Sequence, residues 1–197
     1  YHNNIVSLIN LLQLMPKYDV KGIIFSSSCT VYGQPDVLPA TEETPIKKAE
    51  SPYGNTKQIN EEIIADTIKS GSPIKAILLR YFNPIGAHPT AFIGEMPNGV
   101  PQNLIPYLTQ TAMGIRKELS VFGDDYDTPD GSCIRDYIYV VDLAKAHVCA
   151  MTRIMEDQTT EPVEVYNIGT GTGTSVLELI NAFEKATGVK LNYKIVG

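Results

Sequence analysis

GIIFSSS, residues 22–28, is a short apolar run that ends in three hydroxyl side chains. A continuous apolar run of this length, bounded by glycine and polar residues, is typical of a fully buried strand in a parallel sheet. In open α/β sheets, ligands bind at the carboxyl ends of the strands. We therefore expect the three serines to emerge at the ligand-binding edge of such a sheet.

A helix and a second strand follow this run. Ser51 suits a helix N-cap, and Pro52 suits the first helical position, where no amide hydrogen is needed. The helix extends to about Ser70, where residues 71–73 (GSP) stop it, and residues 75–81 form the next apolar strand. Because a strand, a crossover helix and a strand form a right-handed unit with parallel strands, the sequence predicts an α/β fold.

The other elements are predicted from the same patterns. Residues 3–15 carry a broad apolar helical stripe that ends at Pro16. Residues 82–103 are rich in Pro, Gly and Asn, which indicates a long functional loop or the entry to a second lobe. Further helices are expected at about 103–115, 141–155 and 176–187, and residues 135–140 lead into the helix at 141–155. Strands are expected at 119–122, 163–168 and 191–195.

Composition narrows the classes of function. The chain has 197 residues, 43% of them hydrophobic, and none of its apolar runs approaches the roughly 18 residues that span a bilayer, so we expect no membrane association. Three cysteines without C-x-x-C spacing argue against a disulfide framework and a metal site, and favour a cytoplasmic setting. The net charge of −6 without a basic cluster argues against nucleic acid as a partner. Because the first residue is not methionine, we expect an excerpt of a longer protein.

Tyr53 and Lys57 stand at i and i+4 on the predicted helix and therefore on one face of it. A phenol has an ordinary pKa of about 10, and a neighbouring ammonium lowers that pKa because it favours the phenolate. Such a pair can act as a general base. The pairing alone also arises by chance, so an ordinary solvated helix start remains an alternative. Ser28 and Tyr81, at the ends of the flanking strands, favour a catalytic site.

Residues 169–173 (GTGTG) lie between a predicted strand and a predicted helix. Their spacing is not G-x-G-x-x-G, and no acidic residue follows about 20 positions later within a further βαβ unit. Ser175 and Glu178 fit a capping box for the next helix. We therefore interpret these glycines as a tight turn and not as a dinucleotide-binding loop.

Four motifs, taken in order, resemble the extended short-chain dehydrogenase/reductase family. They are SSSxTVYG at 26–33, SPYGxxK at 51–57, RYFNPxGAHP at 80–89 and RDYI at 135–138. The resemblance covers essentially the whole chain and implies a Rossmann-like parallel sheet with a smaller mixed lobe, in an excerpt that lacks the family's N-terminal Gly-rich loop. It implies that residues 1–81 are the latter part of an NAD-binding domain. Residues 82–197 would be mainly a UDP-sugar-binding lobe, with some segments returning to the sheet.

The resemblance also implies a chemistry, the NAD-dependent C4 epimerisation of UDP-glucose and UDP-galactose through a transient 4-keto sugar. Tyr53 would be the base, Ser28 would bond the reacting hydroxyl, and Lys57 would bind the nicotinamide ribose. Cofactor contacts are implied for Asn3, Ser28, Tyr53, Lys57, Tyr81 and Phe82, and substrate contacts for Ser28, Asn83, Asn103, Leu104, Ser120, Phe122, Arg135 and Tyr137. The family also implies a homodimer in which helices 3–15 and 53–70 pack across the twofold, and a place in galactose metabolism.

Several residues have a plainer interpretation. Asn83 could simply start a turn before a proline, Arg135 and Asp136 could form a surface ion pair, and Phe122 could belong to the core. His147 falls in the middle of a predicted helix, on a packed or solvated face.

Two rival functions remain. A nucleotide-sugar dehydratase or decarboxylase of the same superfamily typically carries an acidic residue just after the serine, where this chain has Cys29 and Thr30. A non-catalytic regulator that senses the dinucleotide usually lacks the tyrosine or the lysine, and this chain has both. These features favour an epimerase.

Overall fold

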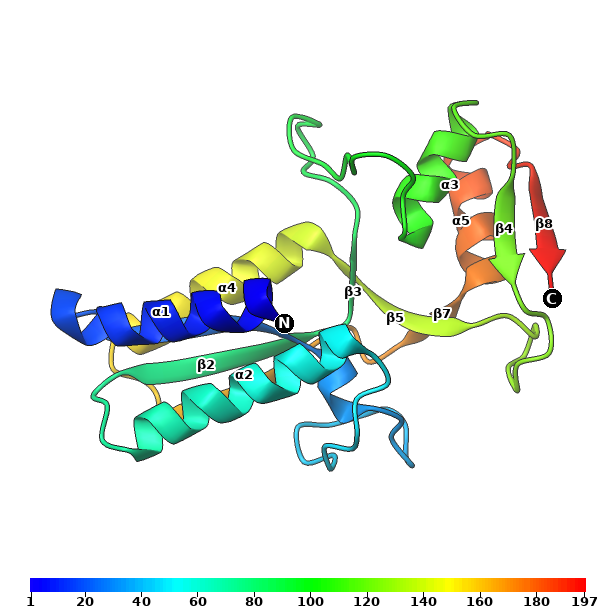
Figure 1. The fold of residues 1–197 in the computed structure, drawn as a ribbon. Helices are drawn as coiled ribbons and strands as arrows, with labels where there is room; N and C mark the ends of the chain where they lie inside the picture. Colours follow the sequence, from blue (N-terminus) through cyan, green and yellow to red (C-terminus); the bar gives the residue numbers. More distant parts are fainter. The chain divides into compact units, whose positions relative to one another are not determined.

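The computed structural model describes residues 1–197 and divides into two compact units, Tyr1–Phe82 with Asp142–Ile168, and Asn83–Val141 with Gly169–Gly197. Figure 1 shows the helices and strands, coloured in the order of the sequence. The helices are α1 (Ser7–Leu14), α2 (Pro52–Lys69), α3 (Leu104–Ala112), α4 (Val140–Met155) and α5 (Val176–Thr187). The strands are β1 (Gly22–Ser28), β2 (Lys75–Tyr81), β3 (Asn83–Ile85), β4 (Leu119–Phe122), β5 (Ile134–Tyr139), β6 (Val163–Ile168), β7 (Gly173–Ser175) and β8 (Tyr193–Val196). The chain also contains a π-helical turn (His2–Val6) and two 3₁₀ turns (Met15–Tyr18 and Cys29–Tyr32). None of the helices combines the length and apolar character needed to span a bilayer.

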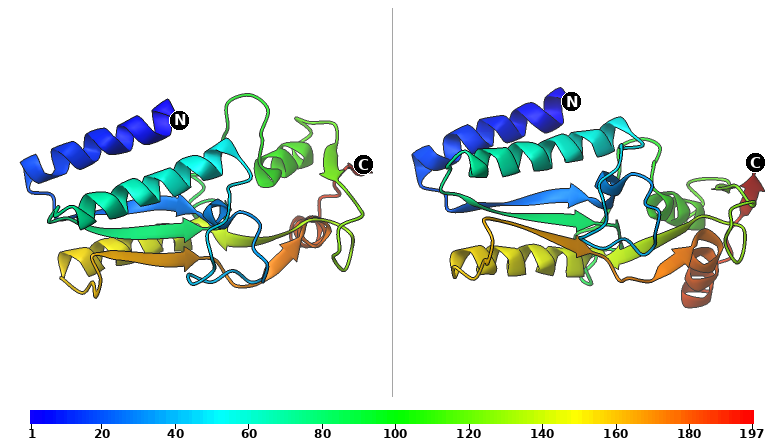
Figure 2. Two further views of the ribbon diagram at one scale, coloured as in Figure 1. Left: turned by 60° about the horizontal axis from the view of Figure 1, so that its bottom comes forward. Right: turned by 90° about the horizontal axis from the view of Figure 1, so that it is seen from below.

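The first unit is built on a parallel sheet in the order β1-β2-β6. Helices α1 and α2 cover one face of this sheet and α4 covers the other (Figure 2). Ser28 pairs in register with Tyr81, and Tyr81 pairs with Ile168, so the three strands end at the same edge. The predicted α/β class with a parallel Rossmann-like sheet is confirmed.

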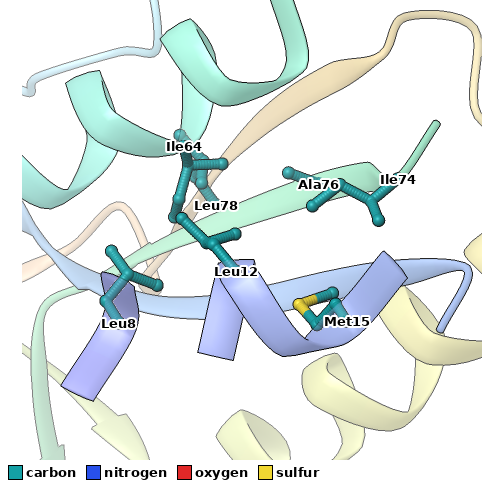
Figure 3. Close-up of a cluster of buried hydrophobic side chains, with 7 residues drawn as sticks. All are labelled: Leu8, Leu12, Met15, Ile64, Ile74, Ala76 and Leu78. Carbon is teal, nitrogen blue, oxygen red and sulfur yellow. The ribbon is translucent and has the colours of Figure 1, made fainter. Parts of the chain in front are cut away.

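Burial on both faces explains the continuous apolar strands of this unit. Side chains alternate between the faces of a strand, so Ala76 and Leu78 of β2 face α1 and α2, whereas Ile77 and Leu79 face α4. The core on the first face also contains residues of both helices, as Figure 3 shows. Its buried members are Leu8, Leu12, Met15, Ile64, Ile74, Ala76 and Leu78.

Helix α2 begins as the sequence predicts. The Ser51 hydroxyl accepts a hydrogen bond from the Gly54 amide at 3.0 Å, and Pro52 occupies the first helical position. A Cβ atom at Gly54 would lie only 3.2 Å from the Thr30 carbonyl oxygen. The missing side chain therefore lets the first turn of α2 approach the turn that follows β1, which brings Tyr53 to the end of that strand.

The second unit contains the parallel pair β4–β8 and a sheet in the order β3-β5-β7, in which β7 runs antiparallel to β5. Its core lies mainly between α3, α5 and β4. The capping box of α5 is confirmed, because the Ser175 hydroxyl accepts from the Glu178 amide and the Glu178 carboxylate accepts from the Ser175 amide.

The short strands β3 and β7 are absent from the sequence-based prediction, since three residues are too few to show a period of two. β7 begins at the last glycine of the GTGTG segment. The residues before it form a turn whose amides are already bonded, because the Asp136 carboxylate accepts from the Thr170 and Gly171 amides and from the Thr170 hydroxyl. This carboxylate occupies the amides that a phosphate would need, which supports interpreting the glycines as a turn.

Candidate active site

The three predicted catalytic residues come together at the carboxyl edge of the first unit's sheet. Ser28 ends β1 and is 7% exposed, whereas Tyr53, on the first turn of α2, is 46% exposed. The Lys57 ammonium lies 5.4 Å from the centre of the Tyr53 ring and donates a hydrogen bond to the Ser26 carbonyl at 2.7 Å. The site therefore presents a phenol that solvent and ligands can reach, with a hydroxyl and a cation beside it.

Burial sets the ionisation of this pair. It is the main cause that raises the pKa of Tyr53, nearby Tyr81 and Cys29 raise it further, and hydrogen bonding with Ser28 lowers it in part. Burial also lowers the pKa of Lys57. The prediction that Lys57 lowers the pKa of Tyr53 is therefore wrong for the chain by itself. The Lys57 ammonium lies over the Tyr53 ring and donates to the Ser26 carbonyl, and it is not among the groups that lower the pKa of this phenol.

His147 of α4 is a neighbour of the site that sequence reasoning missed. Its Nδ1 donates to the Leu143 carbonyl at 2.9 Å, and its Nε2 lies 3.1 Å from the Ser26 hydroxyl, from which it accepts in the neutral ring. Its ring centre is 6.5 Å from that of Tyr81. A lone histidine in a helix gives no signal of such contacts, because they depend on how α4 crosses the sheet.

The predicted cofactor residues occupy different places in the first unit. Tyr81 ends β2 directly beside Ser28, and the Phe82 amide donates to the Ile168 carbonyl at 3.1 Å, so this N–H group is already bonded. Asn3 lies on the exposed π-helical turn before α1, where its carbonyl accepts from a serine hydroxyl at 2.7 Å. The side chain of the next residue, Asn4, reaches α2 and bonds the Thr56 hydroxyl at 3.1 Å.

Three predicted substrate residues share one sheet of the second unit. Asn83 of β3 pairs in register with Tyr137 of β5, and Arg135 lies two residues earlier on β5. The Arg135 guanidinium is exposed and donates to the neighbouring Ile134 carbonyl at 2.8 Å. Because Asp136 bonds the glycine turn instead, the alternative of an Arg135–Asp136 ion pair is not what the structure shows.

The other predicted substrate residues lie elsewhere in the second unit. Asn103 is the N-cap residue of α3, but its side chain donates to Glu95 at 3.2 Å and does not cap the helix. Leu104 packs against the core. Ser120 and Phe122 alternate with the buried residues of β4, and Phe122 is 73% exposed, so its interpretation as a core residue is wrong.

A family model described as "NAD dependent epimerase/dehydratase family" matches residues 1–169. The chain belongs to this family. The resemblance to epimerases of this family is confirmed by two relatives and one crystal structure that are named UDP-glucose 4-epimerases.

UDP-glucose 4-epimerase 2 of Arabidopsis thaliana is 54% identical over 197 residues, which are 100% of this chain and 55% of that protein. The UDP-glucose 4-epimerase of Bacillus subtilis is 50% identical over 194 residues, 98% of this chain and 56% of that protein. A crystal structure of UDP-glucose 4-epimerase from Bifidobacterium longum in complex with NAD⁺ and UDP has a TM-score of 0.92 at 52% identity, and the match covers 100% of this chain and 57% of that one. The chain thus spans just over half the length of these relatives.

Proposed function

We propose that the full-length protein is an NAD-dependent UDP-glucose 4-epimerase that interconverts UDP-glucose and UDP-galactose, in galactose metabolism in the cytoplasm. The observation that carries this proposal is the convergence of Ser28, Tyr53 and Lys57 at one strand edge, in a chain at least 50% identical to named UDP-glucose 4-epimerases. A dehydratase is less well supported, because no carboxylate follows Ser28 at positions 29 and 30.

The residues at this edge fit a nicotinamide cofactor. An ammonium has three N–H donors, and Lys57 uses one of them on the Ser26 carbonyl, which leaves two for ribose hydroxyls. Tyr53 supplies an exposed phenol beside it. Together with Asn3, Tyr81 and Phe82, these residues would hold NAD, which when bound supplies the hydride acceptor for the sugar.

Within the chain, the reaction depends on proton transfer at Tyr53. Tyr53 must ionise before it can act as a base, and hydrogen bonding with Ser28 favours this because it lowers the pKa of the phenol. The ionised Tyr53 oxygen takes the proton of the sugar 4-hydroxyl, and the Ser28 hydroxyl hydrogen-bonds the sugar O4 and orients it. Loss of this proton and of the C4 hydride gives the 4-keto sugar. In the reverse step the hydride returns to the other face of C4 and Tyr53 gives the proton back to O4, so the configuration is inverted and no atom is gained or lost.

The direct test supplies the full-length protein with UDP-glucose and, separately, with UDP-N-acetylglucosamine, and identifies the products by NMR. We expect UDP-galactose from the first substrate, and the second substrate defines the range of sugars accepted. A protein that retains NAD but forms no C4 epimer from UDP-glucose contradicts the proposal.

Arg135 is proposed to bind the diphosphate of the substrate, since a guanidinium suits bidentate contact with phosphate oxygens. We expect Arg135→Ala to raise KM for UDP-glucose by about 10- to 100-fold, the loss typical of hydrogen bonds to a charged group, with kcat little changed. Steady-state kinetics measures both constants. Lys190→Ala is the matched control, because it removes an exposed cation of the same unit that pairs with Glu184. Equal KM values for the two variants would argue against this role.

We also propose a homodimer formed through α1. This helix is apolar nearly all round, and such a helix is normally covered on more than one side. Leu8 and Leu12 face the core, whereas Leu11 and Leu14 on the outer side are 54% and 45% exposed.

We expect Leu11→Glu/Leu14→Glu to convert the dimer to a monomer, as measured by light scattering. The control is Val148→Glu, at a side chain that is 57% exposed on α4, the helix that covers the opposite face of the sheet. This variant should remain dimeric. A wild-type protein that is monomeric at working concentration would contradict the proposed dimer.

A further inference from the structure

A buried ion pair joins β2 to α2 in the first unit. Arg80 of β2 is 5% exposed and Glu61 of α2 is 6% exposed. The Arg80 guanidinium forms two parallel hydrogen bonds with the carboxylate, from Nε to Oε1 at 3.0 Å and from Nη2 to Oε2 at 2.6 Å. Its Nη1 donates to the Tyr32 hydroxyl at 3.1 Å. The fork geometry fixes the direction as well as the distance between strand and helix.

The contacts of this pair extend across the sheet. The Ser27 hydroxyl donates to Glu61, and the Tyr32 hydroxyl donates to the Asn167 amide oxygen at 2.6 Å. Ser27, Arg80 and Asn167 are partners in register on β1, β2 and β6. One polar row therefore joins all three strands of the first unit to α2 and to the turn after β1.

Stability alone does not account for this network. A buried ion pair can often be replaced by apolar residues of similar volume without loss of stability, because desolvation offsets the attraction between the charges. The four residues of β2 before Arg80, residues 76–79, are all buried and apolar, so an apolar side chain would continue the strand. A pair with defined geometry instead specifies one position of α2 relative to the strands.

Three members of the network adjoin residues of the proposed site. Ser27 precedes Ser28, Arg80 precedes Tyr81, and Glu61 lies one helical turn after Lys57 on the same face of α2. We propose that Glu61 and Arg80, with the Ser27 hydroxyl, are positioning residues that fix α2 along its axis and so hold the Tyr53 phenol against Ser28. This inference rests on the proposed epimerase function.

The consequence is kinetic, because a displacement of about 1 Å in a reacting group can lower a rate by about 100-fold. If α2 moves along its axis, the phenol leaves the Ser28 hydroxyl, whose hydrogen bonding lowers the pKa of Tyr53. Two effects should follow together: a lower kcat, and a pH profile of kcat displaced to higher pH. A residue that serves stability alone would produce neither in the folded enzyme.

The test compares two double variants of the full-length protein. Glu61→Met/Arg80→Met replaces the pair with unbranched apolar side chains. The control, Glu164→Met/Arg153→Met, removes a second two-bonded pair of the same unit, with N···O distances of 2.7 and 2.9 Å and a carboxylate side chain that is 6% exposed. Neither control residue contacts the proposed catalytic residues.

We expect the Glu61→Met/Arg80→Met variant to have a kcat about 10- to 100-fold lower than that of the wild type, with KM little changed. Its pH profile of kcat should be displaced to higher pH. The control should keep both the wild-type kcat and the wild-type profile. Glu61→Gln, which retains an oxygen acceptor for Arg80 and Ser27, should recover part of kcat. Wild-type kcat and profile in the Glu61→Met/Arg80→Met variant would overturn the inference.

Amide hydrogen exchange separates this inference from the proposed function. If the wild-type protein forms no C4 epimer, the proposed function fails, and the exchange of residues 53–57 still reports on the position of α2. Faster exchange there in the Glu61→Met/Arg80→Met variant than in the control supports positioning by the pair. Equal exchange in the two variants overturns it.

Discussion

Tyr53→Phe in the full-length protein is expected to lower kcat for the interconversion of UDP-glucose and UDP-galactose by about 100- to 10,000-fold, the range that a general base contributes. The substitution keeps the aromatic ring beside Lys57 and removes only the hydroxyl that exchanges a proton with O4. The variant should therefore fold and retain NAD. Steady-state kinetics and the absorbance of cofactor released on denaturation measure the two properties.

The matched control for this substitution is Tyr18→Phe. Tyr18 is 75% exposed in the turn after α1, so loss of its hydroxyl should leave kcat unchanged. If Tyr53→Phe turns over as fast as the wild type, Tyr53 is not the base. If it loses activity only because NAD is lost, the phenol serves in binding rather than in proton transfer.

Arg80→Met is expected to lower the free energy of unfolding by about 3–5 kcal/mol, because it leaves the Glu61 carboxylate buried without its cation. The double variant Glu61→Met/Arg80→Met should recover most of this loss, since no charge is left unpaired. Urea unfolding, followed by circular dichroism, measures both changes. A double-mutant cycle with Glu61→Met as the fourth corner isolates the coupling between the two side chains.

Arg153→Met is the control for this prediction, because it removes the cation of a similar ion pair in the same unit. Arg153 pairs with Glu164 in the same two-bonded manner, but its side chain is 31% exposed, against 6% for Arg80. Glu164 is as buried as Glu61, but it keeps hydrogen bonds from the Thr160 amide and the Tyr166 hydroxyl when Arg153 is removed. Arg153→Met should therefore destabilise the protein less than Arg80→Met. An Arg80→Met variant as stable as the wild type would contradict this prediction.

Local signals in the sequence predicted much of the first unit. The start of α2 at Ser51 and Pro52 follows from capping and from the fixed backbone of proline, both properties of neighbouring residues. The bounds of β2 follow from its apolar run, and those of β6 from a short segment that contains two valines, a tyrosine and an isoleucine, residue types common in strands. The parallel pairing of β1 with β2 follows from the intervening helix.

Features that depend on packing escaped prediction. Arg80 in an apolar strand and Glu61 on α2 are unremarkable when each is considered alone, and only the position of α2 over the sheet joins them. The contact of His147 with Ser26 likewise depends on the crossing of α4. The sequence did not predict that the pKa of Tyr53 is raised. The spacing of Tyr53 and Lys57 reveals the neighbouring cation, whereas burial of the phenol depends on the whole fold.

The most direct measurement uses UDP-[4-²H]glucose with the full-length protein in ordinary water. Removal of the C4 hydride and its return to the same carbon predict UDP-galactose that carries the deuterium at C4, seen by ²H and ¹H NMR. A chain whose Tyr53 acts on O4 in this way exchanges no carbon-bound hydrogen with solvent. UDP-galactose that carries hydrogen from water at C4, or a product in which deuterium has moved to another carbon, would contradict the account.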